Sequence, residues 1–583
     1  MGSGVIRMSE LRVAYRGPYI AASSAETLER LNAHHGVIAI DTETVSLKDR
    51  TCIGIGIYLN SDEGMYVQVL PETSPILPQV MALCADTRIT KIYHNGMYDL
   101  GVLTDLARHT GLPEPDYFNI EDTSIMAQVQ GQWSNTLQEL GTFDLGFTDM
   151  FSISDLLKKA SEVTGKKKPS MLDVPWQDTA LKCLNDCRAT FNLYSYLNSK
   201  WHSEGEKDCY DVDRKLIPIL HMMEDRGLAL INDKIEQYWE IFAREKLFYE
   251  DICQQWGFNP GSPQQVGYVL ASKGNILPFS KNKRQLVTSE EVLSDLPDGL
   301  AHMILAYRKV TKLLSTYVVP FRGADRAYTH FRIDLATGRL ASGRVESHKH
   351  VCRNQQNIPP DMRDIFAPDD EVDGFTNSDF SQLEMRVFAE QCKDPTMIQA
   401  YKDNKDIHAI THSAVFPGHP WQYYINKDNE SERTVAKTAN FSLIFDAQSY
   451  TLSKHTKLPV SWWDDAKAKW FATYPGARDY INERKSDDRD YAVTDFGRRM
   501  RLPNVFEYPE DHINKCRVNY PTQGTAADIV KRAMLQLGET DLRLQVHDEY
   551  LLNGRYDLER DTFAKIHPEI YTPMDVKHGR VWK

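Results

Sequence analysis

Residues 544–552 read LQVHDEYLL, and they place a histidine, an aspartate and a glutamate side by side in an otherwise apolar segment. The segment is typical of a β-hairpin whose turn region presents His547, Asp548 and Glu549. A polar turn that only joins two strands is the alternative. Burying a carboxylate costs several kcal/mol unless it is paired or holds a metal ion. A cation is therefore expected beside this acidic pair.

Length and composition indicate a large protein of several domains. The chain has 583 residues, 42% hydrophobic and 26% charged, so roughly three or four domains are expected. No apolar run could span a bilayer and no secretory signal opens the chain, which predicts a cytoplasmic protein without membrane attachment. Nine scattered cysteines without a CxxC pair suit a reducing compartment. The net charge of −13 does not indicate general nucleic-acid binding, so any such site must be local.

Hydrophobic patterns divide the chain into three parts. In the first part, GVIAID (36–41) and CIGIGIYL (52–59) predict strands, and helical segments alternate with strands as in an α/β sheet. From about residue 201 to 322, apolar residues recur at three- and four-residue steps, which predicts long helices. The remaining residues mix strands and helices, as an α+β domain does.

Four carboxylates in the first part are candidate metal ligands. Asp41 ends the first predicted strand, and Glu43 lies in the turn after it. Asp99 lies at the start of a predicted helix, and Asp186 lies in the first half of another. Acidic side chains from several elements can share two divalent ions about 4 Å apart, which stabilise the attacking and leaving oxygens of a hydrolysis. A DxE sequence alone is more often a helix cap or a turn.

Three segments of the first part carry a resemblance. IDTET (40–44), NGMYD (95–99) and NDCRATFNLY (185–194) resemble the exonuclease motifs of the proofreading domain in family A DNA polymerases, the DNA polymerase I family. The resemblance implies a ribonuclease-H-like fold that removes a 3′-terminal nucleotide, with these four carboxylates as metal ligands. Lys182 stands where the family has a tyrosine that helps orient the attacking water. A lysine can hold a hydroxide or the scissile phosphate by charge, but its flexible stem positions groups less well than a phenol.

Two segments upstream of the hairpin resemble polymerase motifs of the same family. TNSDFSQLEMRVFAEQ (376–391) reads as a strand running into a helix, with Asp379 at the junction, and resembles the motif DYSQIELR. ERTVAKTANFSLIF (432–445) reads as one uninterrupted helix and resembles the fingers helix. Residues at four-residue steps share one helix face, and here they are Arg433, Lys437, Phe441 and Phe445. An exposed basic face beside a core aromatic edge is the alternative.

Together with LQVHDEYLL as the palm motif, these segments imply a polymerase active site. Asp379 and Asp548 would hold two Mg²⁺ ions, for which Mn²⁺ could substitute, with Glu549 and Lys437 as further catalytic residues. Residues that the resemblance assigns to the incoming nucleotide are Arg433, Lys437, Phe441, Phe445, Glu384, His547 and Gln382. Residues that it assigns to DNA are Arg339, Asn519, Gln523 and Asn357. Arg344 and Lys349 are further candidate DNA contacts, because they lie in a basic loop.

The likeness covers nearly the whole chain and implies an exonuclease domain followed by a right-hand polymerase domain. The expected boundaries are 1–205 for the 3′–5′ exonuclease, 206–325 for the thumb, 326–425 and 516–583 for the two parts of the palm, and 426–515 for the fingers. No segment before the exonuclease could house a 5′-nuclease, so a Klenow-like architecture is expected. Phe445 and Asp446 stand where the family usually has tyrosine and glycine, so nucleotide selection is expected to differ.

The segment 343–353, GRVESHKHVCR, is longer than the linker usual in the family. Zinc binding by His348, His350 and Cys352 is one interpretation, but a closed structural site needs four ligands and no fourth is evident nearby. The preferred interpretation is a basic loop that contacts DNA phosphates, with Arg344 and Lys349 among the donors.

These observations predict a DNA-templated DNA polymerase with a proofreading exonuclease, a monomer that acts on primer-template DNA and dNTPs. Compact size and the departures from the family suggest a bacteriophage enzyme in the cytoplasm of a bacterium or an infected host. The alternatives are a polymerase with impaired proofreading, an exonuclease whose polymerase half is an inactive scaffold, and a non-enzymatic factor that holds primer ends.

Overall fold

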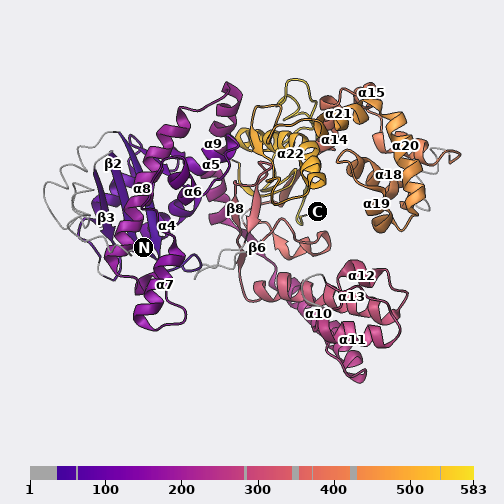
Figure 1. The fold of residues 1–583 in the computed structure, drawn as a ribbon, viewed down its shortest axis with the longest axis horizontal. Helices are drawn as coiled ribbons and strands as arrows, with labels where there is room; N and C mark the ends of the chain where they lie inside the picture. Colours follow the sequence, from indigo (N-terminus) through magenta and orange to yellow (C-terminus); the bar gives the residue numbers. More distant parts are fainter. Residues whose placement is uncertain are drawn as a thin grey trace.

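The computed structural model describes residues 36–60, 63–71, 73–280, 285–343, 353–370, 372–419, 430–538 and 540–582. Figure 1 shows an N-terminal α/β domain, a helical arm, a central region around helix α22 and a helical domain beside it. The predicted DNA contacts Arg344 and Lys349, and the alternative zinc ligands His348, His350 and Cys352, lie outside the described residues.

The N-terminal domain is a five-stranded sheet with helices on both faces, as the alternating patterns predict. Its strand order is β3-β2-β1-β4-β5, in which β1 pairs antiparallel with β2 and parallel with β4. The strands are β1 (Val37–Thr44), β2 (Cys52–Asn60), β3 (Glu63–Gln68), β4 (Thr90–Tyr93) and β5 (Ile120–Asp122). The helices are α3 (Leu77–Ala85), α4 (Gly96–Thr110), α5 (Thr123–Val129), α6 (Leu137–Phe143), α7 (Ile153–Thr164) and α8 (Trp176–Asn198).

Strand β1 extends further than its sequence predicts. Glu43 was expected in a turn, but it lies within the strand because β1 continues to pair with β2, opposite Gly54. Side chains alternate across a strand, so Asp41 and Glu43 face the same side as Ala39, which is buried against α8. The strand therefore points both carboxylates toward α8.

A glycine in β2 allows α8 to lie close to the sheet. Gly56 is paired with Asp41 across the two strands. A Cβ atom on Gly56 would lie 2.7 Å from Cys183 Sγ and 2.8 Å from Cys187 Sγ, which is shorter than a normal contact. Only a residue without a side chain fits here, and this close approach brings the α8 side chains next to Asp41.

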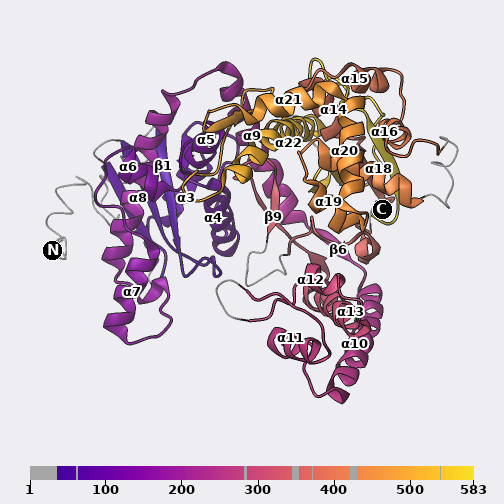
Figure 2. The same ribbon diagram turned by 45° about the vertical axis from the view of Figure 1, so that its right-hand side comes forward.

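Long helices follow, as the sequence predicts for residues 201–322. They are α9 (Glu204–Arg226), α10 (Asn232–Gln255), α11 (Pro263–Ser272), α12 (Glu290–Ser294) and α13 (Gly299–Leu313). Figures 1 and 2 both show α10 to α13 projecting from the rest of the chain. Their separate apolar cluster includes Cys253, Leu270 and Ile304. The arm thus has a core of its own.

The central region contains a four-stranded antiparallel sheet in the order β14-β15-β11-β16. The strands are β11 (Phe375–Phe380), β14 (Leu542–Val546), β15 (Glu549–Asn553) and β16 (Met574–Gly579). The predicted hairpin is therefore confirmed: β14 and β15 are its strands, and His547 and Asp548 form the turn. Short strands beside this sheet are β6 (Leu228–Leu230), β7 (Arg326–Ala327), β8 (His330–Arg332), β9 (Ala341–Gly343) and β10 (Phe366–Ala367).

The helical domain packs around a core that includes Trp463, Trp470 and Tyr474. Its helices are α14 (Leu383–Gln391), α15 (Pro395–Lys402), α16 (Ile407–Val415), α18 (Glu430–Leu443), α19 (Ser449–Thr456), α20 (Val460–Thr473) and α21 (Pro475–Lys485). The expected continuous helix to residue 445 is wrong, because α18 ends at Leu443 and a turn follows, in which Asp446 has φ +54°. Phe445 is consequently not on the helix face of Arg433, and it packs against the domain core.

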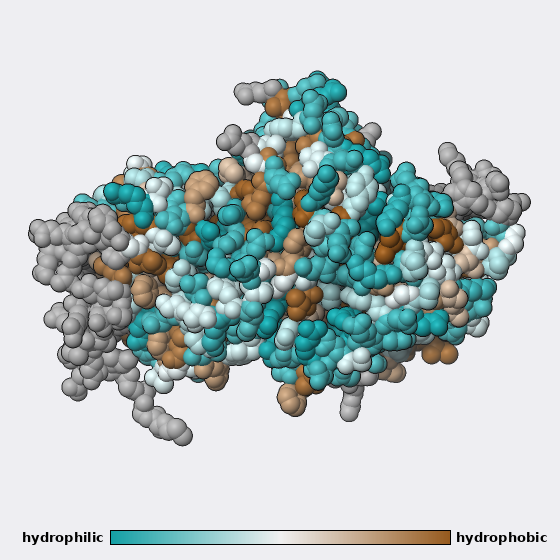
Figure 3. Space-filling model, turned by 90° about the horizontal axis from the view of Figure 1, so that it is seen from above, coloured by the Kyte–Doolittle hydropathy of each residue, from teal (hydrophilic) through white to brown (hydrophobic). Residues whose placement is uncertain are grey.

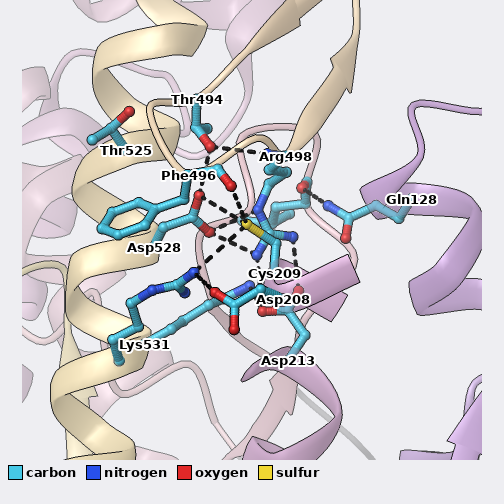
Figure 4. Close-up of polar contacts among 12 residues, drawn as sticks. Gln128, Asp208, Cys209, Asp213, Thr494, Phe496, Arg498, Thr525, Asp528 and Lys531 are labelled. Carbon is cyan, nitrogen blue, oxygen red and sulfur yellow. Dashed lines mark hydrogen bonds and ion pairs between the residues drawn. The ribbon is translucent and has the colours of Figure 1, made fainter. Parts of the chain in front are cut away.

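A buried ion cluster joins α9, α22 (Glu510–Leu537) and the hairpin of β12 (Tyr491–Val493) and β13 (Arg499–Arg501) (Figure 4). The guanidinium of Arg498 donates to both carboxylate oxygens of Asp213 at 2.8 and 2.9 Å, and its Nε donates to Asp528 Oδ1 at 2.8 Å. Lys531 Nζ also donates to Asp213, at 2.8 Å. All four side chains are at most 1% exposed, so two buried cations neutralise two buried anions.

The surface seen in Figure 3 is mostly hydrophilic, with apolar residues in small separate groups. Among the helices described, none combines the length and the apolar character that crossing a bilayer requires.

Candidate active sites

The N-terminal domain brings the four predicted carboxylates together between β1, α4 and α8. Asp99 Oδ1 accepts hydrogen bonds from Thr42 N at 2.9 Å and Thr42 Oγ1 at 2.6 Å, which fixes the first turn of α4 against β1. Asp41 Oδ2 is buried and has no hydrogen-bond partner among the described residues. One ligand atom each of Asp41, Glu43 and Cys183 lie within 4.8 Å of one another. This spacing could accommodate a metal ion.

Burial raises the pKa values of Asp41, Glu43 and Asp99. Burial and the neighbouring carboxylates of Asp186, Glu43 and Asp99 hold the pKa of Asp41 well above its usual range, even though Lys182 opposes them. Burial likewise raises the pKa of Asp99, to about 7. A nearby divalent cation would relieve this unfavourable concentration of negative charge. The donor set therefore fits a metal ion chemically.

Lys182 lies inside this cluster. Its Nζ donates to Glu43 Oε1 at 2.9 Å and to Asp186 Oδ2 at 2.7 Å, and its side chain is only 8% exposed. Burial alone would lower the pKa of Lys182, but the carboxylates of Asp186, Glu43 and Asp41 outweigh it and hold the pKa well above the usual lysine range. A charged ammonium thus bridges two of the four predicted metal ligands.

The second candidate site is a cleft of about 540 Å³ between the central sheet and the helical domain. Asp379 reaches it from β11, and Asp548 reaches it from the hairpin turn, where the carbonyl of Asp548 accepts from Phe380 N at 3.1 Å. His547 has φ +57°, so the turn is tight. Most of the predicted site residues line this cleft: Arg339, Asp379, Gln382, Glu384, Arg433, Lys437, Phe441, His547 and Asp548.

The two aspartates of the cleft repel each other when both are charged. Partial burial and the carboxylates of Asp548 and Glu549 raise the pKa of Asp379 to about 7. Burial also raises the pKa of Asp548, although His547 and Arg339 oppose it. The raised pKa values show that the nearby cations do not offset the negative charge, so the acids of the cleft, like those of the N-terminal site, fit a divalent metal ion.

Glu549 points away from the cleft, into an adjoining cavity of about 620 Å³ that Asp379 also lines. It accepts from Arg363 Nη1 at 3.1 and 3.2 Å and from Trp582 Nε1 at 2.5 Å. The Arg363 guanidinium in turn stacks on the Trp582 ring, 4.1 Å from its centroid. Glu549, the first residue of β15, is therefore held outside the cleft by Arg363 and Trp582, whereas Asp548 in the turn lines the cleft.

The opposite wall of the cleft is cationic. Arg433, Lys437 and Phe441 reach it from successive turns of α18, whereas Phe445 does not line it. Glu384, at the start of α14, forms an ion pair with Arg339 across the cleft. Gln382 caps α14 with φ +56°, and its Oε1 accepts from Tyr401 Oη at 3.1 Å. Acids on one wall thus face cations on the other.

His408 of α16 lines the same cleft, and the sequence analysis missed it. Asn440 donates to His408 Nδ1 at 2.8 Å, because the Asn440 oxygen already accepts from Thr411 Oγ1 and Trp470 Nε1. The proton of the ring is thereby placed on Nε2. Burial lowers the pKa of His408 to about 4, so the ring is neutral at pH 7. Asp406, which accepts from His408 N at 2.9 Å, is typical of a helix start in the sequence, but it does not indicate what the His408 ring contacts.

The predicted DNA contacts are spread over several elements. Asn519 and Gln523 lie on α22, and Asn519 Oδ1 is buried with no hydrogen-bond partner among the described residues. Asn357 is exposed in a loop, where its carbonyl accepts from Tyr317 Oη at 2.9 Å. Of the members of this set that the structure describes, only Arg339 lines the cleft itself.

Comparisons with known proteins match both parts of the chain. The family model of the 3′-5′ exonuclease matches residues 15–202, and the model of DNA polymerase family A matches residues 233–578. DNA polymerase I of Rhizobium leguminosarum is 28% identical over 96% of this chain and 58% of its own length. DNA polymerase I of Caldicellulosiruptor bescii is 31% identical over 64% of this chain and 47% of its own length. The alignments thus span about half to six-tenths of these curated relatives.

A solved structure shares the fold. The polymerase domain of Pol1 from M. smegmatis, in complex with DNA primer-template and dNTP, aligns with a TM-score of 0.75 at 22% identity, over 97% of this chain and 99% of that one. The expected fold, an exonuclease domain followed by a polymerase domain, is confirmed. The polymerase model matches more than half of the residues, and the chain therefore belongs to DNA polymerase family A.

Proposed function

We propose that the chain is a DNA-templated DNA polymerase that adds dNTPs to a primer 3′-hydroxyl and trims 3′ ends with its N-terminal domain. One observation carries the proposal: a single cleft places Asp379 and Asp548 opposite Arg433 and Lys437. Phosphoryl transfer needs acidic ligands for metal ions and cations that hold a triphosphate, and catalysis consists mostly of positioning these charges.

Mg²⁺ is the proposed cofactor, with Mn²⁺ as a substitute. Carboxylate oxygens are the ligands that Mg²⁺ prefers, and both sites hold carboxylates with raised pKa values. Asp379 and Asp548 would hold the ions in the cleft, and Asp41, Glu43, Asp99 and Asp186 are the proposed metal ligands of the exonuclease site. When bound, such ions activate the attacking oxygen and neutralise charge on the leaving group.

The cationic wall would bind the nucleotide. Arg433 and Lys437 would pair with the phosphates, while Phe441 packs against the sugar and base. Neutral His408 can donate Nε2–H to a phosphate oxygen without adding charge. Glu384 would block a ribose 2′-hydroxyl, and its ion pair with Arg339 would hold it in place.

The remaining assignments follow from the same proposal. Asn519, Gln523, Asn357 and Arg339 would contact the primer-template, and the boundaries 1–205, 206–325, 326–425, 426–515 and 516–583 would separate exonuclease, thumb, first palm part, fingers and second palm part. The monomeric state, the cytoplasmic setting and the bacteriophage source stay predictions.

The test is extension of a 5′-labelled primer on a longer template with Mg²⁺, with and without the four dNTPs. Full extension with dNTPs and shortening without them are expected. Shortening alone would instead favour an exonuclease with an inactive polymerase scaffold. A DNA complex whose primer length never changes would refute both activities.

One observation favours a second candidate, a polymerase with impaired proofreading. The Lys182 ammonium pairs with the carboxylates of both Glu43 and Asp186, and the lysine lacks the rigid ring of the family's tyrosine. Extension without any shortening would support this candidate.

A further inference from the structure

The position of the Lys182 ammonium bears on how many metal ions the N-terminal site can hold. Nζ lies between a carboxylate oxygen of β1 and one of α8, 2.9 Å from Glu43 Oε1 and 2.7 Å from Asp186 Oδ2. The side chain is 8% exposed and lies one residue before Cys183, whose Sγ donates to the Asp41 carbonyl at 3.4 Å. Lys182 is therefore fixed inside the acidic cluster.

A divalent ion that used the same two oxygens would overlap this ammonium. Mg²⁺ binds carboxylate oxygens at about 2.0–2.1 Å, and Ca²⁺ binds them at about 2.3–2.6 Å. An ion bridging Glu43 Oε1 and Asp186 Oδ2 would thus fall in the region that Nζ occupies. Steric overlap and repulsion between like charges make the two occupants mutually exclusive.

Oxygen atoms remain for one ion on the other side of the cluster. Asp41 Oδ2 is buried without a hydrogen-bond partner among the described residues. Asp41, Glu43 and Cys183 each offer one potential ligand atom, and these three atoms lie within 4.8 Å of one another. Asp99 is engaged by Thr42 through Oδ1. The unpaired Asp41 oxygen thus marks the remaining position.

We propose that the Lys182 ammonium replaces one of the two divalent ions of the exonuclease site, so that this site takes a single ion, at Asp41. The role of Lys182 in trimming rests on the proposed function, whereas the number of ions that the site binds does not. The bridging lysine supplies one positive charge where a metal ion would supply two, and it offers no position for a metal-bound water.

Counting the Mn²⁺ ions bound to the 583-residue chain tests this proposal. Free Mn²⁺ is measured by electron paramagnetic resonance at increasing total Mn²⁺, without DNA. Lys182→Met, which removes the charge and keeps a similar length, is expected to bind one more ion per chain than the unmodified protein. Lys182→Arg keeps a charge and should leave the count unchanged. Lys159→Met is the matched control, because Lys159 forms an exposed ion pair with Asp178 outside the cluster.

An equal Mn²⁺ count in the unmodified chain and a folded Lys182→Met variant would overturn the proposal. If that variant does not fold, anomalous scattering from Mn²⁺-soaked crystals of the unmodified chain decides. One peak beside Asp41, with Lys182 still against Glu43, supports the proposal, and two peaks in the cluster overturn it.

Primer extension and trimming, measured on the same preparations, distinguish a failure of the role proposed for Lys182 from a failure of the proposed function. Normal extension and trimming with an unchanged ion count would refute the role of Lys182 alone. An extra ion in Lys182→Met, in a chain that neither extends nor trims, would refute the proposed function alone.

Discussion

Replacing Arg498 with methionine should destabilise the chain strongly, because Arg498 neutralises two buried carboxylates. The guanidinium makes three hydrogen bonds of 2.8 to 2.9 Å to Asp213 and Asp528. After the substitution only Lys531 remains, so two buried anions face one cation. Breaking a buried ion pair by removing one partner costs about 3–5 kcal/mol, which at about 2.1 cal/mol/K per residue corresponds to a fall in Tm of about 2–4 °C for a chain of 583 residues.

The assay is thermal unfolding, which is monitored by calorimetry. Arg332→Met is the control, because Arg332 pairs with Asp334 at the surface with 57% of its side chain exposed, and such pairs contribute about 0–1 kcal/mol. A shift for Arg498→Met no larger than that of the control would refute the reasoning.

The pH dependence gives a second check on the same variant. Burial alone would raise the pKa of Asp213, but Arg498 and Lys531 outweigh it and lower the pKa. A lowered native pKa stabilises the fold above the usual aspartate range, and this contribution is lost as the pH falls through the native pKa. The difference between the unmodified chain and Arg498→Met should therefore be largest near neutral pH and narrow below about pH 4.

Further predictions concern the two sites. Asp548→Ala should abolish primer extension and spare trimming, whereas Asp41→Ala combined with Glu43→Ala should abolish trimming and spare extension. Gel analysis of a labelled primer checks both variants. Retained synthesis in Asp548→Ala would contradict the assignment of the cleft. Since a proton competes with the metal for Asp379, whose pKa is about 7, Mn²⁺ affinity of the cleft should rise between about pH 6 and pH 8, and titration calorimetry showing no rise would contradict this. His408→Ala should raise KM for dNTPs about tenfold, and steady-state kinetics with an unchanged KM would exclude a contact between His408 and the nucleotide.

The local motifs of the polymerase cleft could be predicted from the sequence. Alternating apolar residues before His547 and Asp548 and an apolar run after them predict a hairpin, and the strand-to-helix junction places Asp379 beside it. The end of α18 could not be predicted from spacing alone, because residues 432–445 keep a helical pattern beyond Leu443. Phe445 was therefore expected on the last turn of this helix, but it lies in the turn that follows α18.

Contacts between distant segments left little trace in the sequence. Lys182 and Glu43 are 139 residues apart, and Arg498 and Asp213 are 285 residues apart. A lysine at position 182 could be seen as a departure from the family, but its bridge between Glu43 and Asp186 depends on how β1 and α8 pack. His408 was missed because its neutral state depends on burial and on Asn440.

Gly56 suggests a way to tune the exonuclease site without changing any of its ligands. The thiols of Cys183 and Cys187 lie where its side chain would be, and α8 carries Lys182 and Asp186 on the same turns. An added methyl group would act as a wedge between sheet and helix and would widen the distance from Asp41 to both α8 side chains. The separation between β2 and α8 thus determines how far Lys182 and Asp186 lie from Asp41. Larger side chains at position 56 would be expected to weaken trimming in small steps while every acidic residue is kept.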